Sequence, residues 1–181
     1  MKYLLTVVLM CSAIVAGRTS FAADELDPGL VAEIYNIGED LSDFPDLKGK
    51  KPAVTKVDKQ INQDSIDDKW PGTDLEHQFS IHWSGVIKIE KDGKYKFYTE
   101  SDDGSRLLID GKQVVDNNGA HGMEEKDGDV ELKAGDHEFV VDYYEIGGGH
   151  GCKASWEGAG IAKEIIPEKV LFHKKGTEKP K

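Results

Sequence analysis

Residues 79–122, FSIHWSGVIKIEKDGKYKFYTESDDGSRLLIDGKQVVDNNGAHG, alternate between apolar and polar side chains and are divided by short polar turns. Alternation with a period of two is typical of strands that bury one face. Asp92-Gly93 and Asp110-Gly111 each stand between two such runs, and Asp-Gly favours the tight turn of an antiparallel hairpin. This stretch therefore predicts consecutive antiparallel strands.

The same pattern continues on both sides of this stretch. Further strands are expected at residues 30–35, 130–132, 137–144, 151–156 and 165–172. Gly85 falls where the alternation of the first central run changes phase, which predicts a β-bulge or a bend there. Trp83 and Trp156 lie within strand patterns and are expected in the core. No segment has the periodicity of a convincing amphipathic helix, so the sequence predicts an all-β sandwich or barrel.

The first residues have the features of a secretory signal peptide. Lys2 provides a basic start, residues 3–16 are mostly apolar, and small residues precede the cleavage point expected after Ala22. The apolar run is short for a membrane span, so an exported protein in the periplasm or outside the cell is expected, not an integral membrane protein. The division is then a signal peptide over 1–22, one domain over 23–173 and a polar tail over 174–181.

Charge and cysteine content limit the partners of the exported domain. The net charge of −11 becomes two units more negative when the leader, with Lys2 and Arg18, is removed. Nucleic acid and anionic membranes require basic patches, so neither is expected as a partner. Cys152 is the cysteine that remains after Cys11 leaves with the leader. It is expected to be a small buried residue in a strand, with an intermolecular disulfide as the alternative.

The order of the motifs resembles the PA-fourteen domain, a module named after the protective antigen of a bacterial binary toxin. The resemblance rests on residues 79–122, on GDVELKAGDHEFVVDYYEIGGG at 128–149, on ASWEG at 154–158 and on IIPEKVL at 165–171. It covers about residues 30–171 and implies an antiparallel β-sandwich with jelly-roll character. Such domains occur in glycosidases, proteases, toxins and adhesins, and in fungal flocculation adhesins they bind carbohydrate with calcium.

The resemblance also implies a site. In the adhesins two consecutive aspartates joined by a cis peptide hold the calcium, and Asp102 and Asp103 match this pair. A second loop should correspond to residues 145–150. The ligand-binding residues expected there are Glu145, Gly147, Gly148, Gly149 and His150. The adhesins use an asparagine from that loop, and this chain has none there.

The residue types support the same chemistry without the family. Calcium prefers six to eight oxygen ligands, which loops with carboxylates and carbonyls provide. Glycines in a facing loop let a ligand approach the backbone closely. Asn117 and Asn118 follow the second hairpin and are further candidates for ligand contact. The alternative is that Asp102 and Asp103 only shape a polar turn.

The sequence thus predicts an exported, lectin-like module that binds carbohydrate with calcium and serves in adhesion. One alternative is a structural or protein-interaction module of the cell envelope without metal. A third is an accessory protein that acts with a glycoside hydrolase. No nucleophile or metal-hydrolase motif is present, so the chain is not expected to be an enzyme. His121, His137 and His150 lack the spacing of zinc ligands, so no zinc site is predicted.

Overall fold

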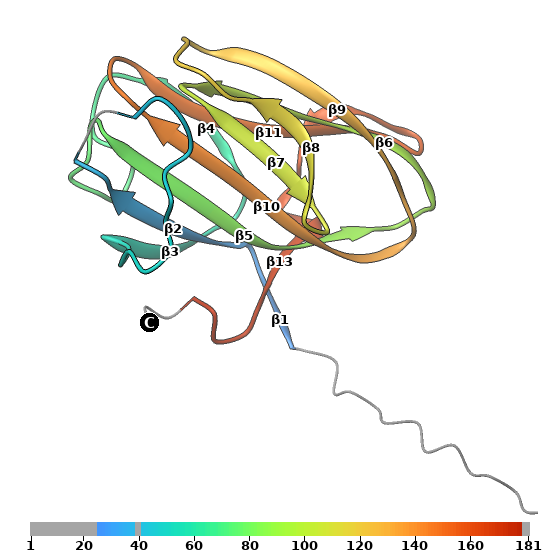
Figure 1. Cartoon of the computed structure of the whole chain (residues 1–181). Coiled ribbons are helices and arrows are strands. Elements are labelled where there is room, and N and C mark those ends of the chain that lie inside the picture. The colour runs from blue at the N-terminus through green and yellow to red at the C-terminus, as the bar shows by residue number, and fades with distance from the viewer. Residues whose placement is uncertain (1–24, 39–40, 179–181) are drawn as a thin grey trace, which may run out of the picture.

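Two antiparallel sheets face each other and form a sandwich in the computed structural model, which describes residues 25–38 and 41–178 (Figure 1). The larger sheet has the order β1-β13-β5-β10-β7-β8, with β2 pairing with β5 and β3. The smaller sheet has the order β12-β11-β6-β9, with β4 pairing with β11. The prediction of an antiparallel β-sandwich is confirmed. The predicted signal peptide at 1–22 lies outside the described residues.

The strands of the larger sheet are β1 (Leu26–Pro28), β2 (Leu30–Asn36), β3 (Val54–Asp58), β5 (Phe79–Ile89), β7 (Ser105–Ile109), β8 (Lys112–Asn117), β10 (Gly135–Glu145) and β13 (Leu171–Lys174). Those of the smaller sheet are β4 (Asn62–Ile66), β6 (Gly93–Asp102), β9 (Glu124–Leu132), β11 (His150–Gly158) and β12 (Ile161–Ile165). A 3₁₀ turn, η1 (Glu168–Val170), precedes β13. Within the described ranges, no helix is long and apolar enough to cross a membrane.

The core lies between the two sheets and is rich in aromatic side chains. Phe139 on β10 and Phe97 on β6 are fully buried, one from each sheet. Trp83 and Trp156 are also buried, as predicted. Burying a large apolar side chain contributes about 1.5–3 kcal/mol, so the inward positions of the alternating strands hold the sheets together. Cys152 is buried and unpaired, which confirms the expected small core residue and removes its sulfur from partners outside.

The prediction of a β-bulge at Gly85 is wrong. β5 pairs with β10 without a register shift from Phe79 to Ile89, and its inward positions keep one phase through the glycine. The glycine is explained by close approach instead, because a Cβ at this position would lie 2.3 Å from the Phe172 carbonyl oxygen on β13. A strand pattern alone does not reveal this neighbour, which follows Gly85 by more than eighty residues.

Two crossings between the sheets lie side by side at one end of the sandwich. The chain passes from β6 to β7 through Asp103 and Gly104, and from β10 to β11 through residues 146–149. Strand pairing aligns the crossings, since Tyr143 is opposite Ser105 and Gly151 is opposite Asp102. Gly104 packs against the Tyr144 ring, and a Cβ there would lie 2.5 Å from that ring. These crossings bring the two predicted loops together.

Two neighbouring leucines on β7 point to opposite faces of the larger sheet, so their substitution tests which face is buried. Leu107 is fully buried, whereas Leu108 is only partly buried on the other face. Leu107→Ala should lower the free energy of unfolding by about 2–5 kcal/mol, because it leaves a cavity between the sheets. Leu108→Ala should cost less than about 1 kcal/mol. Urea denaturation measures both changes, and equal losses would contradict this assignment of faces.

Candidate metal centre

Asp103 connects the β6–β7 turn to two other loops. Its peptide bond with Asp102 is cis, as the resemblance implied, and its side chain is buried. One carboxylate oxygen accepts a hydrogen bond from the backbone N–H of His121 at 3.0 Å. The other oxygen accepts from the backbone N–H of Ile146 at 2.9 Å. The carboxylate therefore holds the loop after β8 and the glycine loop against the same turn.

Asp102 lies directly beneath the glycine loop. Its backbone carbonyl accepts a hydrogen bond from the Tyr143 hydroxyl at 2.6 Å. A Cβ at Gly149 would lie 3.3 Å from Asp102 Oδ2 and 2.8 Å from Ser65 Oγ. Asp67 Oδ1 would be 3.2 Å from the same point. A side chain at 149 would therefore crowd Ser65, Asp67 and Asp102, and the end of β4 forms a further wall of the site.

Glu145 completes a cluster of three carboxylates. One oxygen from each of Asp102, Asp103 and Glu145 lies within 4.8 Å of the others. Glu145 is fully buried at the end of β10, and its Oε2 is 3.4 Å from the Tyr143 hydroxyl. Its Oε1 has no hydrogen-bond partner among the described residues. Buried, unpartnered carboxylate oxygens are costly, so this arrangement requires protons or a cation.

The acidity of the cluster reflects this crowding. Burial, followed by the negative charges of Asp103 and Asp102, raises the pKa of Glu145 to about 8. Burial and the neighbouring Asp103 also raise the pKa of Asp102. A divalent cation between the side chains would replace this repulsion by attraction. The donors are carboxylate oxygens, which fit a hard cation such as calcium.

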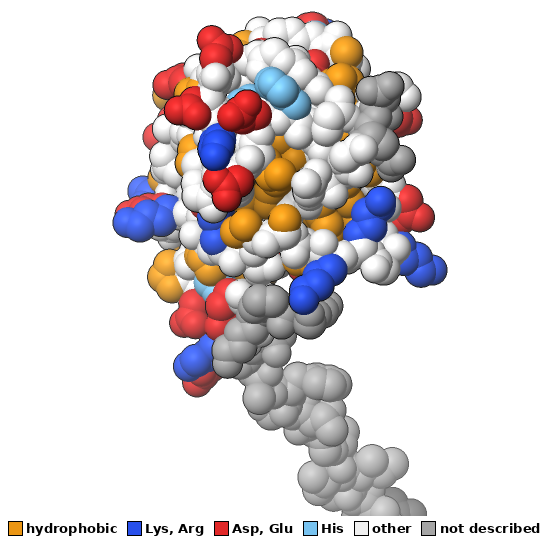
Figure 2. All heavy atoms as spheres, turned by 90° about the vertical axis from the view of Figure 1, so that its left-hand side faces the viewer, with side chains coloured by type: hydrophobic (Ala, Val, Ile, Leu, Met, Phe, Trp, Pro, Cys, Tyr) orange, Lys and Arg blue, Asp and Glu red, His pale blue; other side chains and the backbone are white. Residues whose placement is uncertain are grey.

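Figure 1 places the ends of β6 and β10 at the left-hand end of the sandwich, and Figure 2 looks onto that end. Acidic side chains gather on the upper part of this face, next to a histidine (Figure 2). Gly147 and Gly148 are exposed in the loop, and a Cβ at either position would meet nothing within 4 Å. The glycine loop thus presents bare backbone beside the carboxylate cluster.

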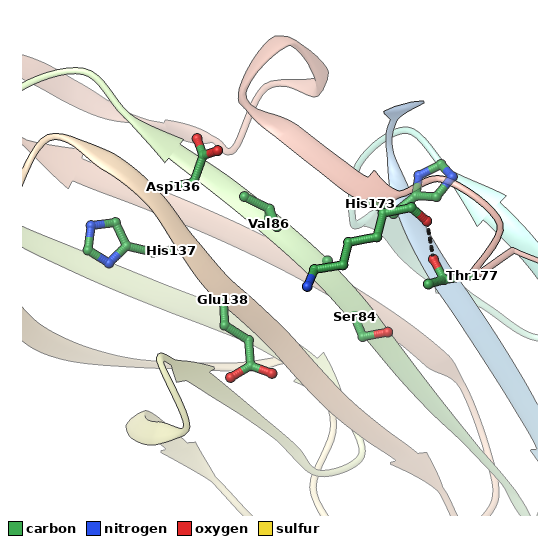
Figure 3. Close-up of a pocket in the computed structure, with 9 residues that line it drawn as sticks. Ser84, Val86, Asp136, His137, Glu138, His173 and Thr177 are labelled. Atoms are coloured by element: carbon green, nitrogen blue, oxygen red, sulfur yellow. Dashed lines mark hydrogen bonds between the residues drawn. The ribbon is translucent and has the colours of Figure 1, made fainter. Parts of the chain in front are cut away.

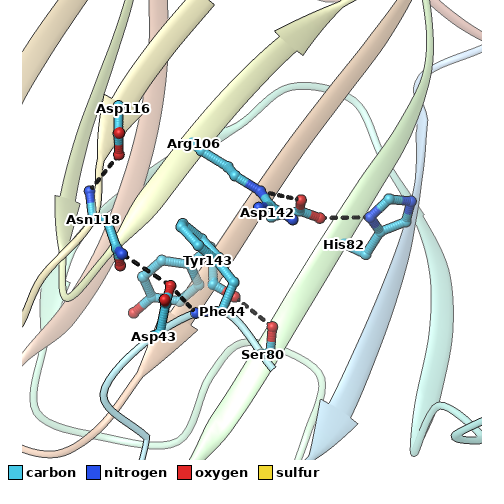
Figure 4. Close-up of polar contacts among 9 residues, drawn as sticks. All are labelled: Asp43, Phe44, Ser80, His82, Arg106, Asp116, Asn118, Asp142 and Tyr143. Carbon is cyan, nitrogen blue, oxygen red and sulfur yellow. Dashed lines mark hydrogen bonds and ion pairs between the residues drawn. The ribbon is translucent and has the colours of Figure 1, made fainter. Parts of the chain in front are cut away.

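The two predicted asparagines have structural partners. Asn117 is buried, and its amide donates to Ser101 Oγ at 3.1 Å and to the Glu124 carbonyl at 2.9 Å. Asn118 donates to Asp43 Oδ1 at 2.9 Å (Figure 4). These amides hold neighbouring loops, and their contact with a ligand stays a prediction.

A second polar network occupies the outer face of the larger sheet near the same end. Asp142 on β10 lies 2.6 Å from His82 Nδ1 and 2.8 Å from Arg106 Nε (Figure 4). The guanidinium of Arg106 also stacks over the Phe44 ring at 4.3 Å. Charged and aromatic partners satisfy this network, and it fastens the loop containing Phe44 to the sheet.

A groove of about 380 Å³ lies toward the start of β10, away from the carboxylate cluster (Figure 3). It is lined by β5, β10 and the end of the described chain, including Val86, His137 and Thr177. None of the predicted site residues lines this groove. The predicted residues therefore converge at the opposite end of the strand.

Sequence reasoning missed two contributors to the site. His77 precedes β5, and its Nδ1 lies 3.5 Å from Glu145 Oε1. Asp67 follows β4 and borders the same glycine loop. Both residues come from the irregular segment before β5, where no local pattern indicates a site.

The titration of Glu145 gives a stability prediction for the metal-free protein. Unfolded Glu145 releases its proton near 4.5, whereas the folded residue keeps it up to about 8. The folded state therefore binds more protons between these values, and stability falls as the pH rises through them. The slope should reach up to about 1.4 kcal/mol per pH unit.

Glu145→Gln should flatten this decline, because the amide cannot titrate. Urea unfolding in a chelator at several pH values measures the effect. Glu138→Gln is the matched control, since Glu138 is exposed on the same strand. Parallel stability profiles for Glu145→Gln and the parent protein would contradict the crowding of charges.

Known proteins share this fold and parts of this sequence. The anti-sigma-I factor RsgI3 of Acetivibrio thermocellus is 30% identical over 99 residues, which span 54% of this chain and only 15% of that protein. An anti-sigma factor domain-containing protein from Clostridium clariflavum superposes with a TM-score of 0.70 at 25% identity, over 86% of this chain and 49% of that one. The PA14 sugar-binding domain from an RTX adhesin has a TM-score of 0.70 at 23% identity, over 81% of this chain and 98% of that one.

The family itself is shown by a match over most of the chain. The family model of the PA14 (PA-fourteen) domain matches residues 26–169. These residues include every strand of the smaller sheet and the crossings that carry Asp102, Asp103 and Glu145. The chain belongs to the PA14 domain family.

Proposed function

We propose that this domain is an exported lectin-like module that binds carbohydrate through a calcium ion held by Asp102, Asp103 and Glu145. The convergence of the three carboxylates, with Glu145 Oε1 unpartnered among the described residues, is the observation that carries the proposal. Calcium takes six to eight oxygens, and three carboxylates leave several of these positions open. Vicinal hydroxyls of a sugar are oxygen donors that can take them.

Glu145 supplies the oxygen that the missing asparagine would provide. It ends β10 directly before the glycine loop and reaches the aspartates from the facing sheet crossing. A carboxylate carries a charge that an amide lacks, so the cluster with calcium keeps one net negative charge. This should strengthen cation binding and disfavour acidic sugars by like-charge repulsion. Neutral glycans are therefore the proposed ligands.

The glycine loop provides the approach for the sugar. Gly147 and Gly148 are exposed and have open space where a side chain would be. A sugar ring bound to the cation can therefore lie against backbone amides and carbonyls of this loop. The name of the RTX adhesin domain, a sugar-binding PA14 domain, supports this proposal through its shared fold.

A metal-free interaction module is the second candidate, and one observation favours it. Asp103 already accepts two backbone hydrogen bonds, so it can hold the loops in place without a cation. That role leaves the buried Oε1 of Glu145 without a hydrogen bond among the described residues. It also leaves two further acids, Asp102 and Glu145, crowded together without compensation.

Asp102→Asn separates the two candidates. Asparagine has nearly the shape of aspartate, so the variant should fold normally while it removes one charged ligand. Calcium affinity should fall at least about tenfold, equal to about 1.4 kcal/mol, in isothermal titration calorimetry. Binding to neutral glycans on an array should fall with it and should vanish for the parent protein in a chelator.

Asp116→Asn is the control, because Asp116 is an exposed aspartate on neighbouring β8. It should bind calcium as the parent protein does. If the parent protein shows no calcium binding, or Asp102→Asn binds equally well, the calcium proposal fails. Glycan binding that persists in the chelator would favour a metal-free interaction module.

A further inference from the structure

We propose that His77, Glu145 and His150 form a second cation site, for a borderline transition-metal ion such as Zn²⁺, beside the carboxylate cluster. One ligand atom from each of the three side chains lies within 4.8 Å of the others. Imidazole nitrogen suits zinc and related ions, whereas calcium prefers oxygen. The second site therefore differs from the first in the chemistry of the ion that it selects.

One of the three pairs of ligand atoms is spaced nearly as in a zinc site. Zinc binds nitrogen and oxygen ligands at about 2.0–2.1 Å, which puts tetrahedral ligand atoms about 3.3 Å apart. His77 Nδ1 and Glu145 Oε1 are already 3.5 Å apart. His77 belongs to the loop before β5, so a small movement of this loop would close the remaining distance to the ion.

Buried polar atoms without partners provide an independent sign of a ligand. Both ring nitrogens of His150 and Oε1 of Glu145 lack a hydrogen bond of normal geometry among the described residues, although the backbone of Asp68 and of Gly148 lies near the His150 ring. Both side chains are fully buried. The His150 ring lies among aromatic rings, with the centroid of Phe79 at 5.7 Å and that of Trp70 at 6.0 Å. Buried polar groups are normally hydrogen-bonded, so these atoms point to an ion between the side chains.

His77 provides the entrance to this site. Its side chain is 48% exposed, whereas Glu145 behind it is fully buried. An ion can thus arrive from solvent and reach two buried ligands. Three protein ligands leave a fourth position for water or another small ligand, as in open zinc sites.

Glu145 belongs to both clusters and couples them. One cluster contains His77 and His150, the other contains Asp102 and Asp103, and Glu145 is the third member of each. A carboxylate has two oxygens and can contact two cations at once. The zinc site itself requires neither Asp102 nor Asp103, so it stands independently of the proposed calcium function.

His77→Ala is the direct test, because the exposed ring is not part of the core or of the aspartate pair. Zn²⁺ titration of the full chain by calorimetry should show one site whose affinity falls at least about tenfold in His77→Ala and His150→Gln. Absorption of bound Co²⁺, a spectroscopic substitute for zinc, should weaken in the same variants.

His137→Gln is the control variant, since His137 lies eight residues from Glu145 along β10, or about 26 Å. It should bind zinc as the parent protein does. Unchanged zinc affinity in His77→Ala would overturn the proposal, as would zinc binding that is lost in Asp102→Asn and retained in His77→Ala. Zinc binding through His77 in a protein that binds no calcium would support this site and remove the proposed calcium function.

Discussion

The carboxylate of Asp103 organises the end of the molecule that carries the carboxylate cluster. It accepts hydrogen bonds from His121 and Ile146, which belong to two different loops, while its own turn carries the chain between the sheets. Because both sheet crossings lie at one end, a single buried side chain fixes all three segments. The bare glycine loop and the clustered acids depend on this arrangement.

Burying acids at this end has a cost that the rest of the fold must offset. The sandwich has an aromatic core, with Phe97 and Phe139 fully buried from opposite sheets. Burial of this core stabilises the fold and offsets the unfavourable free energy of burying the acids. Within the carboxylate cluster, Glu145 shows the effect of this burial most clearly, because burial and two neighbouring acids raise its pKa to about 8. This residue also joins the carboxylate cluster to the histidine pair.

The sequence predicted the strands because alternation and Asp-Gly turns are local properties. It predicted that Asp102 and Asp103 share one cation through the family pattern, since neighbouring side chains on a strand normally point to opposite faces. The sequence predicts a change of phase in β5 at Gly85 that the structure does not have. The glycine is needed there because the Phe172 carbonyl lies close by, and that residue is distant in sequence. Close approach between segments is a property of packing.

The histidine pair shows the same limit more clearly. His77 and Glu145 are separated by 68 residues, and His77 lies in an irregular segment without periodicity. Considering His121, His137 and His150 together gave no zinc spacing, and the structure instead pairs His150 with His77. Glu145 was expected at the site as part of the glycine loop, but its full burial was not foreseen.

A crystal structure with calcium and a neutral disaccharide tests the central claim most directly. The claim predicts one cation bonded to oxygens of Asp102, Asp103 and Glu145, with sugar hydroxyls on its open side next to Gly147 and Gly148. A sugar bound elsewhere, or a carboxylate cluster that holds no cation at saturating calcium, would contradict it.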